Sequence, residues 1–156
     1  MEKKKARNSC KAVIIEDNQI LTIKKIDGDE VYHVLPGGGQ EFGEQFIETV
    51  SRECFEEIGV RPKKVGDILF IREYIGKNHD FPKNHKDVHQ VEYMFLCEIN
   101  KQDIKKGIGE DMGQIGIEWI PISQLLEFNF YPKKLVNELI KYVNNENTRI
   151  YLGDIN

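Results

Sequence analysis

Three closely spaced glutamates are the residues of this sequence best suited to chemistry. Glu53, Glu56 and Glu57 follow a run of glycines, Gly37–Gly39. On a helix that advances about 100° per residue, the three carboxylates fall on one flank, beside the apolar face. Acids at the margin of a core are partly desolvated and repel each other unless a cation compensates their charge. Alone, such acids also fit a solvated helix face.

The glycines next to these acids indicate which chemistry the acids serve. Carboxylate oxygens are ligands that suit Mg²⁺ or Mn²⁺, and such ions commonly bind substrate phosphates as well. Because glycine has no side chain, the turn at Gly37–Gly39 lets the backbone approach a metal or a phosphate closely. Together the two features predict a divalent-metal site that handles phosphates.

The helix that carries the acids is predicted to run from Gln45 to Ile58, because Gly59 supplies a C-terminal stop. Glu48 and Arg52 have the spacing of an i,i+4 ion pair, which is expected to be structural. The apolar residues expected to face the core are Ile47, Val50, Cys54 and Ile58.

Short apolar runs on both sides of this helix predict strands. The expected strands are Lys11–Ile15, Ile20–Lys24, Val31–Leu35, Val65–Ile75, Val91–Ile99 and Glu118–Ile122. The first two should form a hairpin through Glu16–Gln19. A short helix is expected at Ser123–Glu127, and helical spacing predicts a last helix from Pro132 to about Val143. This order predicts an α/β fold in which helices pack on the faces of a mixed sheet.

Composition excludes several classes of function. The 156 residues are expected to form one domain, 1–156, with residues 1–8 as a frayed basic tail. A net charge of -4 gives no general attraction to DNA or to a membrane surface. No apolar run reaches the length of a membrane span. Three cysteines in apolar runs indicate buried thiols and a cytoplasmic location.

The stretch from Gly38 to Val60 resembles the signature of the Nudix hydrolase family. That signature is a glycine, five residues, Glu, seven residues, Arg-Glu, an apolar residue, any residue, Glu-Glu, any residue, glycine and an apolar residue. Its positions are occupied here by Gly38, Glu44, Arg52, Glu53, Cys54, Glu56, Glu57, Gly59 and Val60. Only Cys54 is unusual, because an aliphatic residue is more common there.

The resemblance implies a MutT-like pyrophosphohydrolase with an α/β/α sandwich fold. Such an enzyme uses Mg²⁺ or Mn²⁺ and hydrolyses a nucleoside diphosphate linked to a group X, by attack of water on phosphorus. Glu44 would support the loop or the metal waters, and Arg52 would orient the acids. The implied metal ligands are Glu53, Glu56, Glu57 and the carbonyl oxygen of Gly38. The implied partner is a small nucleotide or nucleotide derivative, and a homodimer is common in the family.

Residues outside the signature complete the predicted site. The general base is either a glutamate of the signature or a loop acid, for which Glu110 and Asp111 are the candidates. Lys24 and Arg72 are expected to meet phosphates, and Tyr74 is expected to stack on a base. Surface charge and ordinary packing are the alternative interpretations of these three residues.

Other functions remain open at this stage. His79, His85 and His89 share one polar loop, where zinc is an alternative to solvated side chains. A nucleotide-sensing Nudix-fold module without hydrolysis is the main alternative to an enzyme. An isoprenoid diphosphate isomerase would need a nucleophilic cysteine. The substrate is left open among nucleoside triphosphates, ADP-ribose or nucleotide sugars, and RNA 5′ ends.

Overall fold

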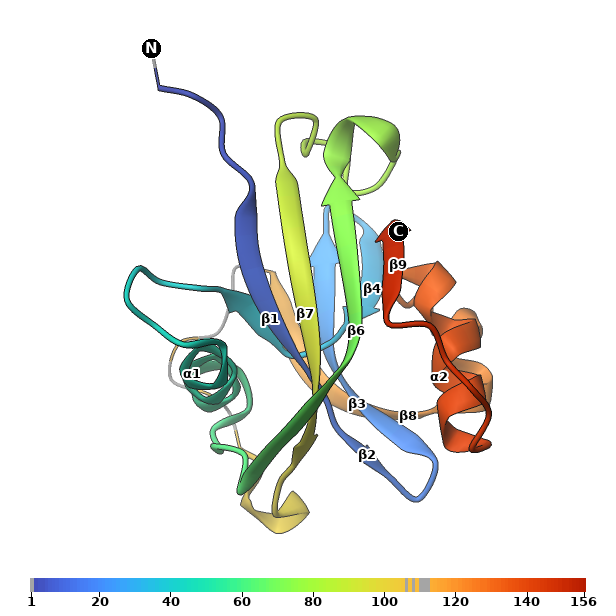
Figure 1. The fold of residues 1–156 in the computed structure, drawn as a ribbon. Helices are drawn as coiled ribbons and strands as arrows, with labels where there is room; N and C mark the ends of the chain where they lie inside the picture. Colours follow the sequence, from blue (N-terminus) through green and yellow to red (C-terminus); the bar gives the residue numbers. More distant parts are fainter. Residues whose placement is uncertain (1, 106, 108, 110–112) are drawn as a thin grey trace.

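The computed structural model describes residues 2–105, 107, 109 and 113–156. Two β-sheets form the centre of the molecule, and helices α1 and α2 lie on opposite sides of them (Figure 1). The strands are β1 (Arg7–Val13), β2 (Ile15–Glu16), β3 (Gln19–Asp27), β4 (Glu30–Val34), β5 (Gly37–Gly39), β6 (Lys64–Ile75), β7 (His89–Glu98), β8 (Gln114–Pro121) and β9 (Tyr151–Asp154). The predicted α/β sandwich is confirmed.

The first sheet has the strand order β5-β1-β7-β6-β9 and is mixed. Strand β1 runs parallel to β7 and antiparallel to β5, while β6 is antiparallel to β7 and parallel to β9. Arg7 and Asn8 already pair with β7, so the sheet includes two residues that the sequence assigned to the frayed tail. Strand β5 therefore forms an edge of this sheet, next to β1.

The second sheet is built on β3, which pairs with β2, β4 and β8. The predicted hairpin is confirmed as β2–β3, with Asp17 and Asn18 at φ 53° and 58° in its turn. Consecutive left-handed residues match the twist of a two-residue hairpin. The expected strand Lys11–Ile15 is divided, because the buried residue Ile14 lies between β1 and β2.

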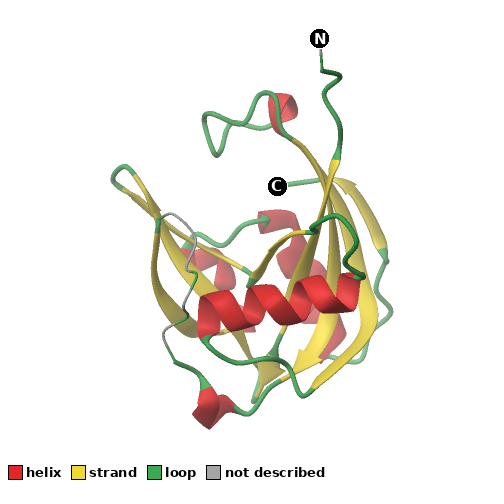
Figure 2. Ribbon diagram, turned by 90° about the vertical axis from the view of Figure 1, so that its left-hand side faces the viewer, coloured by secondary structure: helices red, strands yellow, loops and turns green. Residues whose placement is uncertain are grey.

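Helix α1 (Phe46–Ile58) begins at a capping box formed by Gln45 and Glu48 and ends at Gly59, whose φ is 73°. Figure 2 shows it lying in front of the strands. Val50, Cys54 and Ile58 are buried as predicted, but Ile47 is 52% exposed. Phe46 takes its place, since its ring stacks on Tyr93 with the centroids 4.3 Å apart. The buried stripe is therefore the i,i+4 row that starts one residue earlier.

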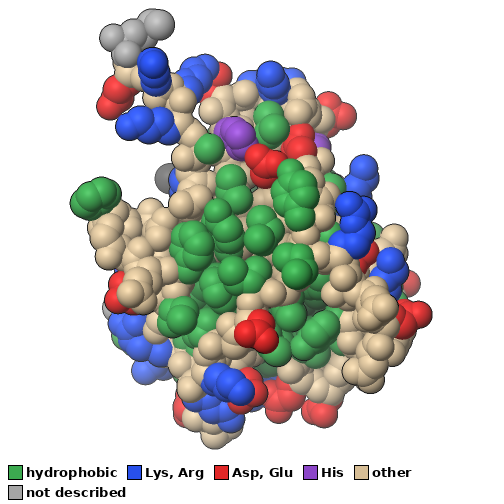
Figure 3. Space-filling model, viewed as in Figure 1, with side chains coloured by type: hydrophobic (Ala, Val, Ile, Leu, Met, Phe, Trp, Pro, Cys, Tyr) green, Lys and Arg blue, Asp and Glu red, His purple; other side chains and the backbone are tan. Residues whose placement is uncertain are grey.

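Two apolar cores lie on the two sides of the first sheet. One contains residues of α1 together with the cysteines, and the other receives α2 (Val136–Val143) and the 3₁₀ segment Ile122–Phe128. The predicted last helix starts later than Pro132, after a 3₁₀ turn at Lys133–Leu135. In the view of Figure 3, apolar side chains also remain visible over the strands between the two helices.

The three cysteines are buried free thiols, as the sequence predicted. Burial raises the pKa of Cys10 and of Cys97 to about 12, and that of Cys54 also well above its ordinary value. Within the part of the chain that the structure describes, no helix is long and apolar enough to cross a membrane.

Candidate active site

Strand β5, called the glycine strand below, requires glycine at each position for a separate steric reason. A Cβ on Gly38 would lie 2.6 Å from the carboxylate of Glu53. Gly37 has φ 137°, and a Cβ there would lie 2.1 Å from the carbonyl oxygen of Cys10 in β1. A Cβ on Gly39 would overlap the guanidinium of Arg7. The triple glycine thus lets the backbone of β1 approach at Gly37 and charged side chains approach at Gly38 and Gly39.

The glycine strand is joined to α1 by polar contacts. The N–H of Gly37 donates to Oε1 of Glu57 at 2.7 Å, and the carbonyl of Gly39 accepts from Nη2 of Arg52 at 2.9 Å. Glu57 is 2% exposed and Glu53 is 7% exposed. These carboxylates therefore lie at the buried side of the helix, as the sequence predicted, rather than on a solvated face.

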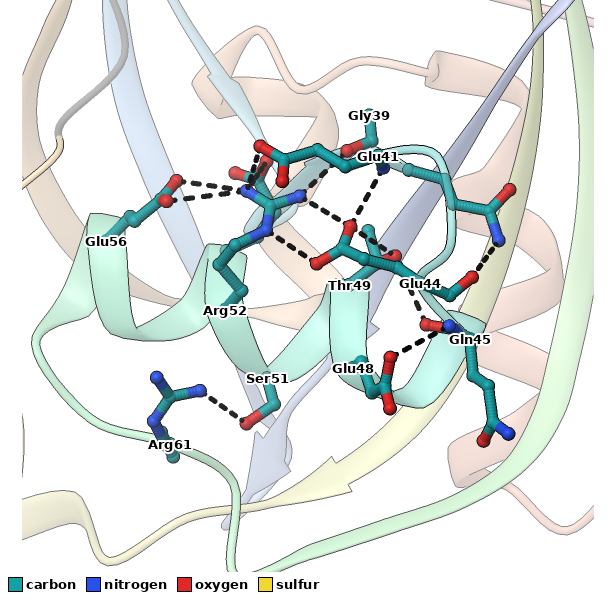
Figure 4. A network of polar contacts seen from close by, with 12 residues as sticks. Gly39, Glu41, Glu44, Gln45, Glu48, Thr49, Ser51, Arg52, Glu56 and Arg61 are labelled. Carbon is teal, nitrogen blue, oxygen red and sulfur yellow. Dashed lines mark hydrogen bonds and ion pairs between the residues drawn. The ribbon is translucent and has the colours of Figure 1, made fainter.

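Arg52 is the centre of the network around the acids (Figure 4). Its Nε and Nη2 donate to the two carboxylate oxygens of Glu44 at 2.8 and 3.0 Å. Its Nη1 donates to Glu53 at 3.0 Å and lies 3.3 Å from the nearer oxygen of Glu56. The predicted Glu48–Arg52 pair is wrong, because Glu48 accepts from the backbone N–H of Gln45 in the helix cap.

Several carboxylates of this network share one guanidinium. Arg52 reaches the carboxylates of Glu44, Glu53 and Glu56 with one positive charge. Hydrogen bonding by Arg52 lowers the pKa of Glu44 to about 2, and the same bond raises the pKa of Arg52 above its ordinary value. An excess of carboxylates at a partly buried site is unfavourable unless another cation approaches.

The donor set fits a hard divalent ion. We call Glu53, Glu56 and Glu57 the acid trio; they offer carboxylate oxygens, which Mg²⁺ and Mn²⁺ prefer. The missing side chain of Gly38 leaves room beside the carboxylate of Glu53. Among the described residues no ready-made cluster of three ligands occurs, because Arg52 lies between Glu53 and Glu56 while Glu57 is bonded to Gly37.

The two predicted loop acids, Glu110 and Asp111, lie outside the described residues. The described neighbours of that segment contact the helix of the acid trio. The N–H of Gly109 donates to the carbonyl of Glu56 at 3.0 Å, and a Cβ on Gly107 would overlap the backbone of Glu56.

A cavity of about 180 Å³ opens on the inner face of the first sheet. That volume is more than ten times what one water needs, so the cavity has room for a ligand group. We call it the aromatic cavity; the lining residues used below are Lys11, Lys25, Tyr32, Arg72, Tyr74, Phe81, Glu92 and Tyr131. Phe81 and Tyr131 stack with centroids 4.7 Å apart, and Tyr32 meets Phe81 edge-on.

The three predicted substrate-binding residues have different positions. Arg72 and Tyr74 line the aromatic cavity, whereas Lys24 is not among its lining residues. Arg72 donates to both oxygens of Glu92 at 2.9 and 3.1 Å and is 8% exposed. The ring of Tyr74 is 4% exposed and stacks on His79, so the predicted stacking on a base is not prepared in this conformation.

Glu92 is buried and ionised within the cavity wall. Burial raises its pKa, but the charges of Arg72 and Lys11, with hydrogen bonds from Arg72 and Gln90, outweigh it and lower the pKa to about 2. Sequence reasoning missed Glu92 and Lys11. The available signal was a charged residue beside apolar residues in each of two predicted strands, which indicates either a buried ion pair or a site.

The three histidines of the loop have separate partners. His79 Nε2 lies 2.7 Å from Asp154, His89 Nε2 lies 3.1 Å from Glu73, and Nδ1 of His85 faces the hydroxyl of Tyr74 at 3.4 Å. These contacts fix the loop against β6 and β9 rather than gathering the imidazoles around a zinc ion.

Comparison with known proteins identifies the class. Residues 6–139 match the NUDIX domain model. An RNA pyrophosphohydrolase of Pelagibacter ubique (strain HTCC1062) is 26% identical over 153 residues, covering 89% of this chain and 94% of the relative.

Solved structures agree with this fold. A NUDIX hydrolase of Nitrosomonas europaea superimposes with a TM-score of 0.72 at 14% identity, covering 99% of this chain and 81% of the other. The MutT protein of Methanosarcina mazei Go1 gives 0.69 at 19% identity, covering 93% and 98%. The chain belongs to the Nudix family. Its class is the Nudix pyrophosphohydrolases, which hydrolyse acid anhydrides.

Proposed function

We propose that this chain hydrolyses a phosphoanhydride bond in a nucleoside diphosphate linked to a group X, by attack of water on phosphorus, with Mg²⁺ or Mn²⁺ as cofactor. The observation that carries the proposal is the gathering of Arg52 and the acid trio against the glycine strand. Clustered carboxylates beside a backbone without side chains suit a divalent ion and the phosphates that the ion binds.

The acid trio, with the carbonyl oxygen of Gly38, would hold the ion. When bound, the ion neutralises charge on the diphosphate, polarises a phosphorus–oxygen bond and lowers the pKa of water. Arg52 keeps Glu53 and Glu56 oriented, and Glu44 in turn fixes the guanidinium of Arg52 through two hydrogen bonds. Replacing residues that orient metal ligands in this way typically lowers metal affinity or activity about 10- to 100-fold.

Proton removal from the attacking water is assigned to an acid of this site. A glutamate of the acid trio and the loop acids Glu110 and Asp111 are retained as alternatives. The three thiols are buried, and burial raises their pKa values, which disfavours the thiolate that a nucleophile requires. The isomerase alternative therefore gains no support.

The substrate class is a nucleotide or nucleotide derivative. The relative named above acts, by its name, on RNA, while similar folds include a UDP-X diphosphatase and an ADP-ribose pyrophosphatase. Free thiols support the predicted cytoplasmic location. A homodimer and the absence of a DNA partner stay predictions.

A product-resolved screen tests the proposal. Purified protein is incubated with Mg²⁺ or Mn²⁺ and with nucleoside triphosphates, nucleotide sugars, ADP-ribose and 5′-triphosphorylated RNA. We expect metal-dependent release of a nucleoside monophosphate, pyrophosphate or orthophosphate from at least one class. Binding without any hydrolysis across the panel would favour the nucleotide-sensing alternative and contradict the proposal.

A further inference from the structure

The glycine strand presents different chemistry on its two faces. Successive residues of a strand point to opposite sides. Gly38 lies against the carboxylate of Glu53, and Gly39 lies against the guanidinium of Arg7. The carbonyl of Gly37 accepts from Lys11, so an acid and two cations approach β5 at successive glycines. Strand β5 is an edge strand of the first sheet, and its glycines lie between the acids of α1 and the cations of β1.

Lys11 connects the glycine strand with the aromatic cavity. Its Nζ donates to the carbonyl of Gly37 at 3.2 Å, while the N–H of the same glycine donates to Glu57. The side chain also lines the cavity, and its charge contributes to the lowered pKa of Glu92. Lys11 thus stands at the junction between the cavity and the acid trio.

A buried hydroxyl lies between the two cations. Ser9 occupies the position between Arg7 and Lys11 on the same face of β1, directly opposite Gly39 in the register. The residue is 1% exposed, and its Oγ has no hydrogen-bond partner among the described residues. A buried polar group without a partner is unfavourable and indicates a place where a ligand atom gains a hydrogen bond.

We propose that Arg7, Ser9 and Lys11 bind the phosphate groups of the substrate between the aromatic cavity and the acid trio. Lys11, which reaches the cavity, contacts the phosphate next to the nucleoside. Arg7, which is exposed beside Gly39, contacts the phosphate further along the chain. The ligand class is a nucleoside 5′-diphosphate or 5′-triphosphate moiety. This inference rests on the proposed function, because it assumes that the end of the phosphate chain binds at the acid trio.

Equilibrium binding tests the inference separately from catalysis. Calorimetry measures the affinities of ATP, GTP, CTP and UTP and of the four nucleosides, with Ca²⁺ replacing Mg²⁺ as a hard cation for oxygen ligands. Lys11→Met keeps most of the aliphatic stem and removes the charge. We expect it to weaken binding of the tightest triphosphate at least about tenfold and that of its nucleoside less than about twofold.

Further variants separate ligand binding from structure. Arg7→Met is expected to weaken triphosphate binding about tenfold, and Ser9→Ala about threefold. Ser9→Ala should leave the midpoint of thermal unfolding unchanged, since the hydroxyl has no hydrogen-bond partner in the described part of the chain. Lys64→Met, at an exposed position at the start of β6, is the matched charge control and should change neither affinity.

The outcomes of these binding measurements either support or overturn the phosphate site. Unchanged triphosphate affinity in Lys11→Met, or an equal loss for triphosphate and nucleoside, would overturn the inference. Absence of triphosphate binding in the wild-type protein would overturn it as well. Triphosphate binding that depends on Lys11 without any hydrolysis would instead support the phosphate site and contradict the proposed reaction.

Discussion

Two arginine–glutamate networks in this molecule differ in how many carboxylates share one arginine. Arg72 lies in the wall of the aromatic cavity and forms a buried pair with the single carboxylate of Glu92. Its Nη1 also donates to the carbonyl of Ile155 at 2.7 Å. Arg72 and Glu92 are nearly excluded from water, and Lys11 adds a second positive charge toward the same carboxylate, so this network can hold its geometry without any further ion.

The network at Arg52 has more carboxylates around its arginine. One guanidinium, with a side chain that is 21% exposed, serves Glu44, Glu53 and Glu56, while Glu57 bonds to the glycine strand. The same residue types thus build a structural support at Arg72 and the proposed cation site at Arg52. The number of carboxylates for each arginine makes the difference.

The largest expected effect is at the acid trio. Glu56→Gln and Glu57→Gln each remove a charge that the proposed ion requires, so each should lower kcat about 1000-fold, or about 4 kcal/mol in transition-state stabilisation. Steady-state kinetics with Mg²⁺ measure the loss, and far-ultraviolet circular dichroism should show a folded protein. Near wild-type turnover in either variant would contradict the role of the acid trio as the metal site.

A substitution in the network of Arg72 and Glu92 is expected to lower stability. Glu92→Gln leaves the buried charge of Arg72 without its carboxylate and should lower the free energy of unfolding by about 3 kcal/mol. Urea unfolding provides the measurement. The double variant Arg72→Met/Glu92→Leu should recover most of this loss, because no unpaired charge remains. A double variant as unstable as the single one would show that the charge balance is not what matters here.

Acid should weaken the same network. The carboxyl of Glu92 has an ordinary pKa of 4.5 and a folded-state pKa of about 2. A lowered pKa means that the unfolded chain binds the proton more readily, so stability is full above the ordinary value and falls as the pH drops toward 2. The contribution is roughly 3 kcal/mol. Unfolding free energies measured between about pH 6 and pH 2.5 should therefore fall more steeply in the wild type than in Arg72→Met/Glu92→Leu.

The smallest expected effect comes from a substitution at Arg52 that changes the geometry of the side chain but keeps its charge. Arg52→Lys keeps the positive charge but loses the planar fork that contacts Glu44 and Glu53 together. We expect kcat to fall about tenfold, with metal affinity reduced to a similar extent. A wild-type kcat in Arg52→Lys, with a reduced kcat in Arg52→Met, would show that the guanidinium contributes nothing beyond its charge.

Local patterns were sufficient to predict the central elements. The helix of the acid trio has a C-terminal glycine and an apolar stripe, and the hairpin has a tight polar turn; both features depend on neighbouring residues. The resemblance in the signature supplied the roles of the acids. The aromatic cavity was not predictable in this way, since its walls come from distant strands and loops.

The errors have a common physical origin, because local spacing in the sequence does not contain the tertiary contacts that decided each position. Ile47 was placed in the core because its helical angle was right, but Phe46 has the larger ring that reaches Tyr93. Arg52 was paired with Glu48 by spacing, whereas the tertiary fold offers it Glu44 and the glycine strand. Strand β5 itself was missed, because glycines have low strand propensity and pair here only through β1.

Binding of Mn²⁺ tests the central claim most directly. Titration of the protein with Mn²⁺, followed by the electron paramagnetic resonance signal of the free ion, reports metal binding without turnover. We expect the wild-type protein to take up Mn²⁺, Mg²⁺ to compete for it, and Glu56→Gln/Glu57→Gln to lose most of the affinity. Uptake that is equal in the wild type and in this double variant would contradict the assignment of the acid trio as the ligands.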